Sequence, residues 1–521
     1  MKTNRDKHYD KFINFYKNNK EFDVIIIGGG ITGAGIALGC AMNHLNTLLI
    51  ESNDFGYSSS GNSSKLVHGG LRYLQNGQFH ITFQSVKERE KLLKELPKLI
   101  WPIYFILPYY NLKEKIMYKS GLILYDFFAG KQYHKNVKIE EILEWFPYIR
   151  RFKEKNNIKY KLKGGYLYQD AQTDDIRLLI RTLKEAENNG AIILNYFSAK
   201  DLLLEDNIVK GVIGYDLITQ KEFNIKSKIV INATGFLADI FRTKLGLEKI
   251  MRPLRGSHIV IEYKKLPVKY ALGFSHPEDK RNIFVLPWFG KTIVGTTDVD
   301  HQNQNNNPIS ISSITEQEIE YLLKGVNYQF PDAKISKKEI YSTWSGVRPV
   351  VSRDPNIPPS KESRDIFIEF YKNLLTVTGG KLTTFRLEAK KVLKILRNHF
   401  PIKKWYFTFK NLSLLELEQF FEKKEIDFIK NEIVDHERII NFYGKDSIEI
   451  LKNIIKNPKI IANITFYKEN NIIYEEELKY SIKNEWVLNW EDFYYRRFRF
   501  GIVQKEKEDL IKSLYKNTIS K

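Results

Sequence analysis

Short apolar runs alternate with helical patterns in the N-terminal part of the chain. Residues 23–27 and 47–51 form apolar runs rich in Ile, Leu and Val, and residues 31–43 between them carry a helical pattern. Short runs of this kind are typical of buried strands, and strands separated by helices indicate a parallel sheet. The pattern therefore predicts an α/β fold that begins with a strand–helix–strand unit.

Glycines at the spacing G-x-G-x-x-G join the first apolar run to the helix, at Gly28, Gly30 and Gly33. Gly28 allows the sharp turn, Gly30 lets the backbone approach a pyrophosphate, and Gly33 lets the helix pack closely on the strand. The N-terminal end of the helix directs its positive dipole at the same pyrophosphate. Glu51 closes the second strand, where a carboxylate accepts hydrogen bonds from a ribose diol. Together these features predict a dinucleotide-binding unit.

A second contact with the dinucleotide is expected near residue 235. Residues 207–225 alternate apolar and polar positions like a β-meander, and a strand-like run follows at 229–232. That run leads into Ala-Thr-Gly, which ends at Gly235. A strand followed by this tripeptide, after a meander, is similar to the second FAD contact of the glutathione-reductase-like flavoprotein fold. A Rossmann domain that binds NAD alone has little use for it.

The rest of the chain divides into two kinds of pattern. Residues 250–340 favour strands, and the chain after about residue 410 is mostly helical. A chain of 521 residues is too long for one core. We predict an α/β fold with a glutathione-reductase-like FAD-binding Rossmann domain, a strand-rich substrate cap and an all-α C-terminal domain. The expected boundaries are 22–85, 165–248 and 340–400 for the FAD-binding domain, 86–164 and 249–339 for the substrate-binding cap, and 405–521 for the C-terminal domain.

The charge of the chain leaves several classes of partner open. The formal net charge of +20 favours nucleic acid, an anionic membrane surface or anionic substrates. Lys, Asn, Ile, Tyr and Phe are abundant together and have codons rich in A and T, so genomic base bias also explains much of the excess. Since the sequence carries no recognisable nucleic-acid module and no paired Cys/His ligands, we expect neither a nucleic-acid partner nor a metal site.

Cysteine content and hydropathy limit the cellular compartments in which the protein is expected. Residues 1–21 mix basic and acidic side chains without an apolar run, so no secretory signal is expected. No segment approaches about 18 uncharged apolar residues, and no membrane-spanning helix is expected. The single cysteine, Cys40, excludes a disulfide framework and suits a reducing cytosol.

The densest stretch of functional groups runs from Ser58 to Leu74. Its hydroxyls and backbone amides can hydrogen-bond phosphate and ribityl oxygens. His68 precedes a Gly-Gly break that keeps its imidazole accessible, and an ordinary pKa of about 6.5 lets a histidine accept a proton from an alcohol. Spacing alone leaves a flexible Ser-rich linker with an incidental histidine equally open.

The same stretch carries a resemblance to a known family. Residues 63–74, Ser-Ser-Lys-Leu-Val-His-Gly-Gly-Leu-Arg-Tyr-Leu, resemble the signature of the FAD-dependent, quinone-linked glycerol-3-phosphate dehydrogenases. The resemblance spans about residues 22–500 in unbroken order. It continues at 168–170, 174–178, 256–260, 295–299, 345–349, 363–365, 379–384, 485–487 and 496–497.

The resemblance implies FAD as cofactor and a defined reaction. Glycerol 3-phosphate would be oxidised to dihydroxyacetone phosphate by hydride transfer to FAD, and the electrons would pass to a membrane quinone. His68 is then the candidate base for the hydroxyl proton. Arg348 and Arg364 are candidates for the phosphate, because the guanidinium fork binds phosphate bidentately. Lys381 is the candidate that stabilises the anion formed at flavin N1 and the C2 carbonyl.

The expected site residues follow from these motifs. Catalytic roles are expected for His68, Arg348 and Lys381, and substrate binding for Arg72, Tyr73, Arg348 and Arg364. FAD is expected to contact Gly28, Gly30, Gly33, Glu51, Ser59, Ser63, Ser64, Gly235, Gly380, Lys381, Leu382 and Thr383. Either Thr383 or Thr384 is expected to cap the helix that follows.

Two rival functions and the location stay open. A glycerol-3-phosphate oxidase would pass the electrons to oxygen and release hydrogen peroxide, and a non-catalytic nucleotide-binding scaffold would keep only the glycine turn. A quinone acceptor implies a cytoplasmic protein bound peripherally to the anionic face of the inner membrane. Residues 101–119 and 493–500 are the candidate lipid-facing patches, and a homodimer is one possible assembly.

Overall fold

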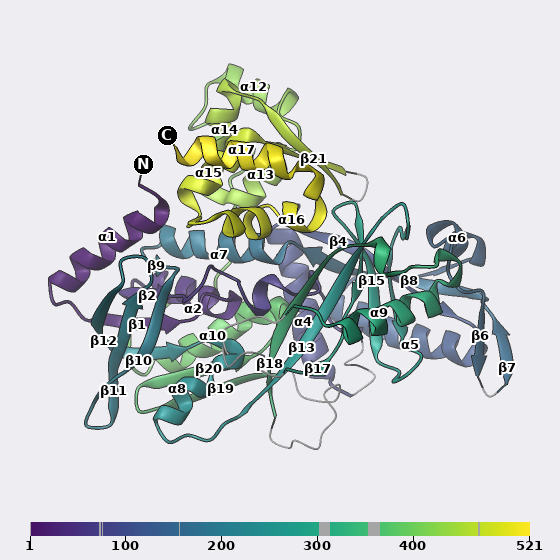
Figure 1. The fold of residues 1–521 in the computed structure, drawn as a ribbon, viewed down its shortest axis with the longest axis horizontal. Helices are drawn as coiled ribbons and strands as arrows, with labels where there is room; N and C mark the ends of the chain where they lie inside the picture. Colours follow the sequence, from purple (N-terminus) through teal and green to yellow (C-terminus); the bar gives the residue numbers. More distant parts are fainter. Residues whose placement is uncertain are drawn as a thin grey trace.

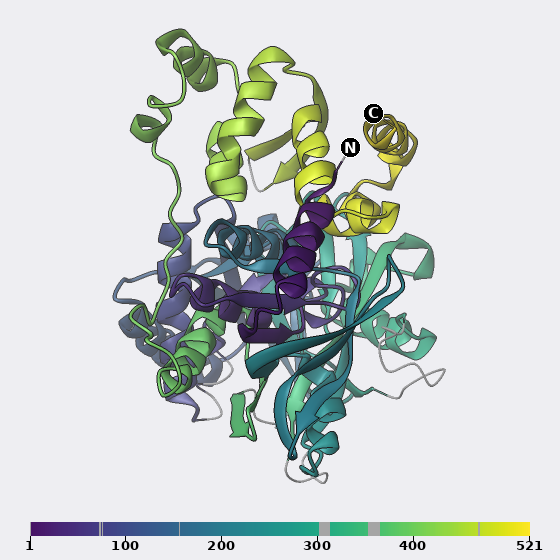
Figure 2. The same ribbon diagram turned by 90° about the vertical axis from the view of Figure 1, so that its left-hand side faces the viewer.

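The fold is organised around two large β-sheets, and the C-terminal helices pack against them (Figure 1). The computed structural model describes residues 2–71, 74, 77–155, 157–301, 313–352, 365–466 and 469–520. In the first sheet the central strands are parallel, whereas the second is mainly antiparallel. The two chain ends lie close together beside the C-terminal helices (Figures 1 and 2).

The first sheet is built around the predicted strand–helix–strand unit. Its order is β10-β11-β12-β1-β2-β9, with β20 pairing with β12 and β19 with β20. These strands are β1 (Phe22–Ile27), β2 (Thr47–Ile50), β9 (Ile192–Leu194), β10 (Phe197–Glu205), β11 (Ile208–Asp216), β12 (Lys221–Asn232), β19 (Ile366–Tyr371) and β20 (Leu374–Gly379). Because a central parallel strand is covered on both faces, Val24, Ile25 and Ile26 of β1 are fully buried.

Helices cover one face of the parallel part of this sheet, and the antiparallel meander packs on the other. Residues 221–226 of β12 pair with β11 in the meander, whereas residues 227–232 pair with β1. The covering helices are α2 (Ile31–Ala41), α7 (Asp175–Asn188) and α10 (Phe385–Leu396), which share one apolar core with Val24 and Ile26. The meander β10–β12 and the N-terminal helix α1 (Asn4–Lys17) pack against Ile25 and Ile27 on the opposite face.

The N-terminal helix gives a structural purpose to residues that the sequence left unassigned. Phe12 of α1 is fully buried and lies edge-on to Phe223, with the ring centroids 5.2 Å apart. Arg5 forms a buried ion pair with Asp216 at the end of β11. The extension therefore covers the meander, which would otherwise expose apolar side chains.

The second sheet forms the strand-rich layer. Its order is β17-β13-β16-β15-β14-β4-β8-β3, with β18 pairing with β13 and β5 with β8. These strands are β3 (Leu66–Val67), β4 (Ile100–Tyr109), β5 (Lys135–Val137), β8 (Gly164–Thr173), β13 (Met251–Glu262), β14 (Ala271–Ser275), β15 (Asn282–Trp288), β16 (Lys291–Gly295), β17 (Val299–Asp300) and β18 (Ile340–Val351). The helices around it are α4 (Phe79–Glu95), α5 (Leu112–Ala129), α6 (Ile139–Trp145) and α9 (Glu316–Gln329).

The C-terminal region is helical, with one departure from the expected all-α domain. Its elements are α11 (Leu414–Leu417), α12 (Lys423–Asn431), α13 (His436–Tyr443), α14 (Ser447–Lys456), α15 (Glu475–Asn484), a π-helical segment Asp492–Arg497, α16 (Phe500–Val503) and α17 (Glu508–Ile519). Between α14 and α15 the chain also forms an antiparallel hairpin, β21 (Ile460–Phe466) and β22 (Glu469–Tyr474). β-Branched residues in both runs favour strands, and this short signal was hidden among the flanking helical patterns.

Buried ion pairs join the C-terminal region to α7 and to the segment after β2. Glu485 accepts hydrogen bonds from both terminal nitrogens of Arg177 in α7, at 3.0 and 2.6 Å. Asp54 accepts two from Arg497, at 2.7 and 2.8 Å, and one from Arg496 at 2.6 Å. Burial by itself raises the pKa of each carboxyl, but the guanidinium groups outweigh it and hold both pKa values below their usual range. Each buried carboxylate thus depends on its arginine.

We expect Arg177→Ala to lower the free energy of unfolding by about 3–5 kcal/mol, because it leaves Glu485 charged and buried without its bidentate partner. Denaturant unfolding followed by circular dichroism measures the change. The matched control is Lys200→Ala, which removes an exposed pair with Glu222 at 2.9 Å and should change stability by less than about 1 kcal/mol. Equal losses in the two variants would contradict the assignment.

Candidate active site

The turn between β1 and α2 brings separate backbone segments into close contact. Gly28 has φ +115°, and a Cβ there would lie 2.5 Å from the carbonyl oxygen of Ala233. A Cβ on Gly33 would overlap the carbonyl oxygen of Gly28. At Gly30, by contrast, the nearest atom to a Cβ is Ser60 Oγ, at 3.1 Å. The glycines therefore let the helix, the strand and the Ala-Thr-Gly segment meet with no side chain between them.

Glu51 lies beside this turn at the end of β2. Its Oε2 accepts a hydrogen bond from the Gly29 N–H at 2.7 Å, and its Oε1 accepts one from the Asn53 N–H at 2.9 Å. Burial raises the pKa of this carboxyl, and the two backbone donors oppose the rise. Glu51 thus holds the glycine turn in place as well as facing the adjoining cavity.

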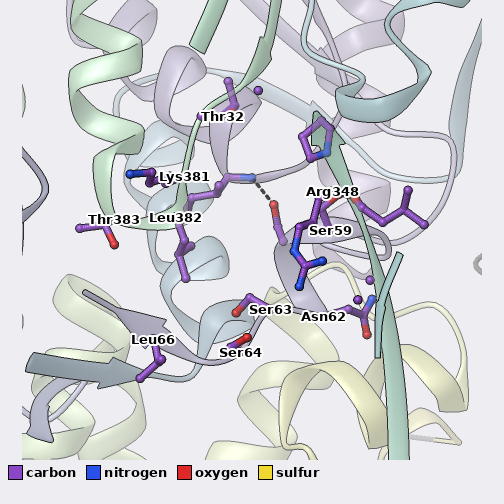
Figure 3. A pocket seen from close by; sticks show the side chains of 18 of the residues that line it. Thr32, Ser59, Asn62, Ser63, Ser64, Leu66, Arg348, Lys381, Leu382 and Thr383 are labelled. Carbon is purple, nitrogen blue, oxygen red and sulfur yellow. Dashed lines mark hydrogen bonds between the residues drawn. The ribbon is translucent and has the colours of Figure 1, made fainter. Parts of the chain in front are cut away.

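Two cavities meet at the N-terminus of α2. One, of about 190 Å³, is lined by Gly28, Glu51 and Gly235. The other, of about 240 Å³, is lined by His68, Arg348 and Lys381. Figure 3 labels Arg348 and Lys381 among its lining residues. Both are lined by Ile31, Thr32, Ser59, Ser60, Pro349 and Gly379. An elongated dinucleotide with its diphosphate at the helix N-terminus fits across the two, so we name them the nucleotide cavity and the reaction cavity.

The structure brings most of the predicted site residues to these cavities. The nucleotide cavity receives Gly28, Gly30, Glu51, Ser59 and Gly235, and the reaction cavity receives Ser59, Ser63, Ser64, His68, Arg348, Gly380, Lys381, Leu382 and Thr383. Gly33 is buried in α2, where it allows the helix to pack on the turn. The predicted substrate residues Arg72, Tyr73 and Arg364 lie outside the described residues.

The Ser-rich loop is held by buried charges. Asp175, in the first turn of α7, accepts hydrogen bonds from Ser63 Oγ at 2.7 Å and from Lys65 Nζ at 2.8 Å. Arg499 of the C-terminal region pairs with the same carboxylate. Burial and the neighbouring Arg499 lower the pKa of Lys65 to about 8, against the opposing effect of Asp175. These contacts order the loop, so it is not a flexible linker.

His68 is tied to the segment that carries Lys381. The His68 N–H donates to Thr383 Oγ1 at 3.1 Å, and Thr383 Oγ1 lies 3.3 Å from the His68 carbonyl oxygen. The next residue, Gly69, has no room for a side chain because Tyr125 packs against it. The half-buried imidazole itself lines the reaction cavity.

Arg348 is oriented by the second sheet. Its guanidinium donates to Asp298 Oδ1 at 2.8 Å, to Thr296 Oγ1 at 2.7 Å and to the Thr297 carbonyl at 3.2 Å. A Cβ at Gly256, on the neighbouring strand β13, would overlap this guanidinium. The motifs around residues 256 and 296, which had no predicted role, therefore hold Arg348 in a fixed orientation.

His258 is a site residue to which the sequence analysis gave no role. It is almost fully buried and stacks on Trp344 with a centroid distance of 4.9 Å, and its Nε2 lies 2.9 Å from Ser64 Oγ. Burial lowers its pKa well below the usual value, and the nearby charges of Arg348 and Lys65 add to the effect. A neutral imidazole therefore forms part of the cavity wall. Its place in the 256–260 motif was the signal that could have identified it.

Glu388 of α10 lies beneath the turn that precedes Lys381. Its Oε1 accepts hydrogen bonds from the Lys381 N–H at 2.8 Å and from Thr384 Oγ1 at 3.1 Å, and Thr32 Oγ1 donates to its Oε2 at 3.2 Å. The expected threonine cap is wrong, since neither Thr383 nor Thr384 caps α10 through its side chain. Burial raises the pKa of Glu388 to about 7.

We expect Glu388→Gln to flatten the dependence of stability on pH. A carboxyl whose pKa rises from 4.5 to about 7 on folding contributes stability that is complete below pH 4.5 and is lost as the pH rises through 7. The loss amounts to about 3 kcal/mol, which the glutamine variant should lack. Denaturant unfolding at pH 5 and pH 8 measures it. Glu316→Gln, at an exposed position, should keep the wild-type dependence; a parallel profile for Glu388→Gln would contradict the prediction.

Comparison with known proteins agrees with this geometry. Residues 23–385 match the family model of FAD dependent oxidoreductases. The chain is 34% identical to the aerobic glycerol-3-phosphate dehydrogenase of Staphylococcus haemolyticus, over 96% of this chain and 91% of that protein. The corresponding Staphylococcus aureus protein is 33% identical over 92% of this chain and 87% of its own length.

Solved structures show the same relationship. The glycerol-3-phosphate dehydrogenase from Bacillus halodurans, complexed with FAD, superposes with a TM-score of 0.72 and 26% identity, over 99% of this chain and 94% of that one. The L-alpha-glycerophosphate oxidase from Mycoplasma pneumoniae with FAD bound shares the fold, with a TM-score of 0.54 and 17% identity, over 73% of this chain and 95% of that one. The predicted fold class and the predicted cofactor, FAD, are thereby confirmed. The chain belongs to the FAD-dependent glycerol-3-phosphate dehydrogenase family.

Proposed function

We propose that the protein oxidises glycerol 3-phosphate to dihydroxyacetone phosphate and passes the electrons to a membrane quinone. The observation that carries the proposal is the convergence of His68, Arg348 and Lys381 on a reaction cavity that continues into the nucleotide cavity. A non-catalytic scaffold would need the nucleotide cavity alone. The names of the curated relatives supply the substrate.

Each residue of the reaction cavity has a chemical task in this proposal. FAD, when bound, supplies the hydride acceptor. His68 accepts the hydroxyl proton, and Arg348 binds the anionic end of the substrate in an orientation fixed by Asp298. Lys381 and the N-terminal end of α10 supply positive charge where negative charge develops. Arg72, Tyr73 and Arg364, outside the described residues, remain candidates for further phosphate contacts.

Quinone is the acceptor that we favour over oxygen. The dehydrogenase structure covers 99% of this chain, whereas the oxidase structure covers 73%. The curated relatives that match nearly the full length carry the dehydrogenase name. An oxidase would release hydrogen peroxide during turnover, which a peroxide electrode detects, and it would not need a quinone analogue.

We further propose that α5 binds the anionic cytoplasmic face of the inner membrane peripherally. Leu112, Ile116, Ile123 and Phe127 are between 53% and 76% exposed. At 100° per residue these four side chains fall within about 60° of the helix circumference, so they form one apolar stripe, the α5 stripe. A stripe of this kind suits a helix that lies in the membrane interface.

The surroundings of the α5 stripe support this orientation. Phe79 and Phe83 of α4 are 51% and 42% exposed, and the Phe83 ring lies 5.5 Å from that of Phe128 in α5. Lys113, Lys115 and Lys119 of α5 are exposed and would attract anionic headgroups, by about 1 kcal/mol each. Among the described helices, none has both the length and the apolar composition needed to cross a bilayer.

The second candidate patch is unsuitable for lipid contact. Within residues 493–500, Phe493 and Phe500 are fully buried and Arg497 is paired with Asp54. Phe493 and Phe500 pack in the apolar core of the C-terminal region, and Asp54 lies in the segment after β2. The first candidate, residues 101–119, divides between the largely buried strand β4 and the exposed start of α5.

We expect His68→Ala to slow flavin reduction by about two to four orders of magnitude while FAD stays bound, because the hydroxyl proton loses its acceptor. Anaerobic stopped-flow mixing with glycerol 3-phosphate, followed at the flavin absorbance, measures the rate. His399→Ala, at an exposed histidine of the turn after α10, serves as control and should keep the wild-type rate. A near-normal rate in His68→Ala would show that His68 is not the proton acceptor. If glycerol 3-phosphate did not bleach the flavin of the wild-type protein, the proposed substrate would be wrong.

We expect the double variant Ile116→Glu/Phe127→Glu to bind vesicles at least about tenfold more weakly, because charge replaces the centre of the apolar stripe. Flotation with vesicles of phosphatidylglycerol and phosphatidylcholine measures binding. The matched control is Leu415→Glu/Leu510→Glu, which alters exposed leucines of the C-terminal region that are 75% and 46% exposed. Equal loss in both pairs, or none in either, would reject α5 as the lipid contact.

A further inference from the structure

We infer that a third cavity, bordered by β4, β8, β13, β15 and β16, binds the ring of the quinone acceptor. This inference rests on the proposed function. The cavity has a volume of about 440 Å³, larger than either the nucleotide cavity or the reaction cavity. We name it the acceptor cavity, and the lining residues that matter here are Trp101, Gln172, Trp288, Phe289 and Lys291.

The walls of the acceptor cavity suit a flat apolar ring. The ring of Phe289 lies 5.9 Å from that of Trp101 and 4.4 Å from that of Trp288, centroid to centroid. Pro102 and Pro287 extend the apolar lining. Aromatic side chains stack on planar ligands, and an apolar cavity with a few fixed polar groups is the usual form of a small-molecule site.

Two buried hydrogen-bond donors in this lining lack an acceptor among the described residues: Trp288 Nε1 and Gln172 Nε2. Both residues are 1% exposed. The amide of Gln172 cannot simply be reversed, because its Oε1 accepts a hydrogen bond from Trp101 Nε1 at 3.1 Å and an indole N–H only donates. Each unmet donor costs about 1–3 kcal/mol, which a ligand with acceptor oxygens would recover.

The chemistry of the site selects a neutral ligand. Three lysines line the cavity. Lys291 pairs with Glu262, Nζ to Oε1 at 2.5 Å, Lys269 lies 3.9 Å from Glu144, and Lys264 is exposed to solvent, so none places an unbalanced charge in the buried part of the lining. The unmet groups are donors without formal charge, and they call for carbonyl oxygens rather than for a phosphate. A planar, neutral, apolar ring that carries carbonyl acceptors is a quinone.

The acceptor cavity and the reaction cavity share a wall of the second sheet. Leu66 lines the reaction cavity, and its cross-strand partner Gln172 lines the acceptor cavity. Opposed residues of antiparallel strands have Cα atoms about 4.5–5.5 Å apart. The two cavities therefore come close together at this pair of strands.

A series of rings also connects them. Trp288 of the acceptor cavity lies 6.3 Å from Trp344, which stacks on His258 at 4.9 Å, and His258 lines the reaction cavity. Lys65 Nζ lies 4.9 Å from the Trp344 ring and 5.5 Å from the Trp288 ring. These contacts form a continuous series of packed rings between the two cavities.

The overall reaction balances without a further reagent. The secondary alcohol loses two electrons and two protons as its C–H and O–H bonds break and the C=O bond forms. The quinone gains two electrons and two protons and becomes the hydroquinone. As charge develops on the quinone oxygens, the donors of Trp288 and Gln172 strengthen their hydrogen bonds to them.

The test uses the FAD-loaded protein and 2-methyl-1,4-naphthoquinone as probe. Calorimetry and quenching of tryptophan fluorescence give the Kd without turnover. Gln172→Glu keeps the size of the side chain and removes the amide donor, and Trp288→Phe removes the indole donor. We expect each variant to raise the Kd about tenfold or more.

Controls separate this inference from the proposed function. Trp405→Phe alters a tryptophan outside the cavity and should leave the Kd unchanged. Circular dichroism verifies that each variant is folded. Because the two variants remove donors on different strands, one of them still tests the inference if the other does not fold. If both folded variants kept the wild-type Kd while glycerol 3-phosphate still bleached the flavin of the wild-type protein, the assignment of the acceptor cavity alone would be wrong. Absence of bleaching would overturn the proposed function and this inference with it.

Discussion

The contact of bare backbone at the glycine turn is the constraint on which the rest of the structure depends. Gly28 leaves space for the Ala233 carbonyl, and Gly33 leaves space for the carbonyl of Gly28. This contact brings the N-terminus of α2 to the edge where β1 and β12 end. Backbone donors and open space then coincide at one point, and the nucleotide cavity and the reaction cavity extend from it.

The second sheet converts this opening into a site with specific chemistry. The antiparallel register of β13 and β18 pairs Gly256 with Gly346 and His258 with Trp344. That register places the Arg348 guanidinium over Gly256 and the His258 imidazole beside Ser64. Because successive side chains of a strand point to opposite faces, a shift by one residue would turn these side chains to the other face of the sheet and leave buried polar groups without partners.

Charge is balanced locally, even though the chain as a whole is strongly basic. Arg348 pairs with Asp298, Lys65 with Asp175, and Arg177 with Glu485. Asp175 also pairs with Arg499, so the C-terminal region helps to order the Ser-rich loop at the reaction cavity. The C-terminal region is therefore part of the site's support, although no residue from it lines the reaction cavity within the described chain.

The sequence by itself determined the features that depend on near neighbours. The glycine spacing, the acidic end of β2, the parallel strands and the C-terminal helices all follow from local patterns, as does the family, through motifs such as residues 63–74. Only the tertiary structure decided the fit of Glu388 beneath Gly380, the stacking of His258 on Trp344, the cover that α1 provides and the acceptor cavity. These contacts join segments that are distant in the chain and meet only after folding. They depend on strand register and side-chain packing, and no local sequence pattern encodes either.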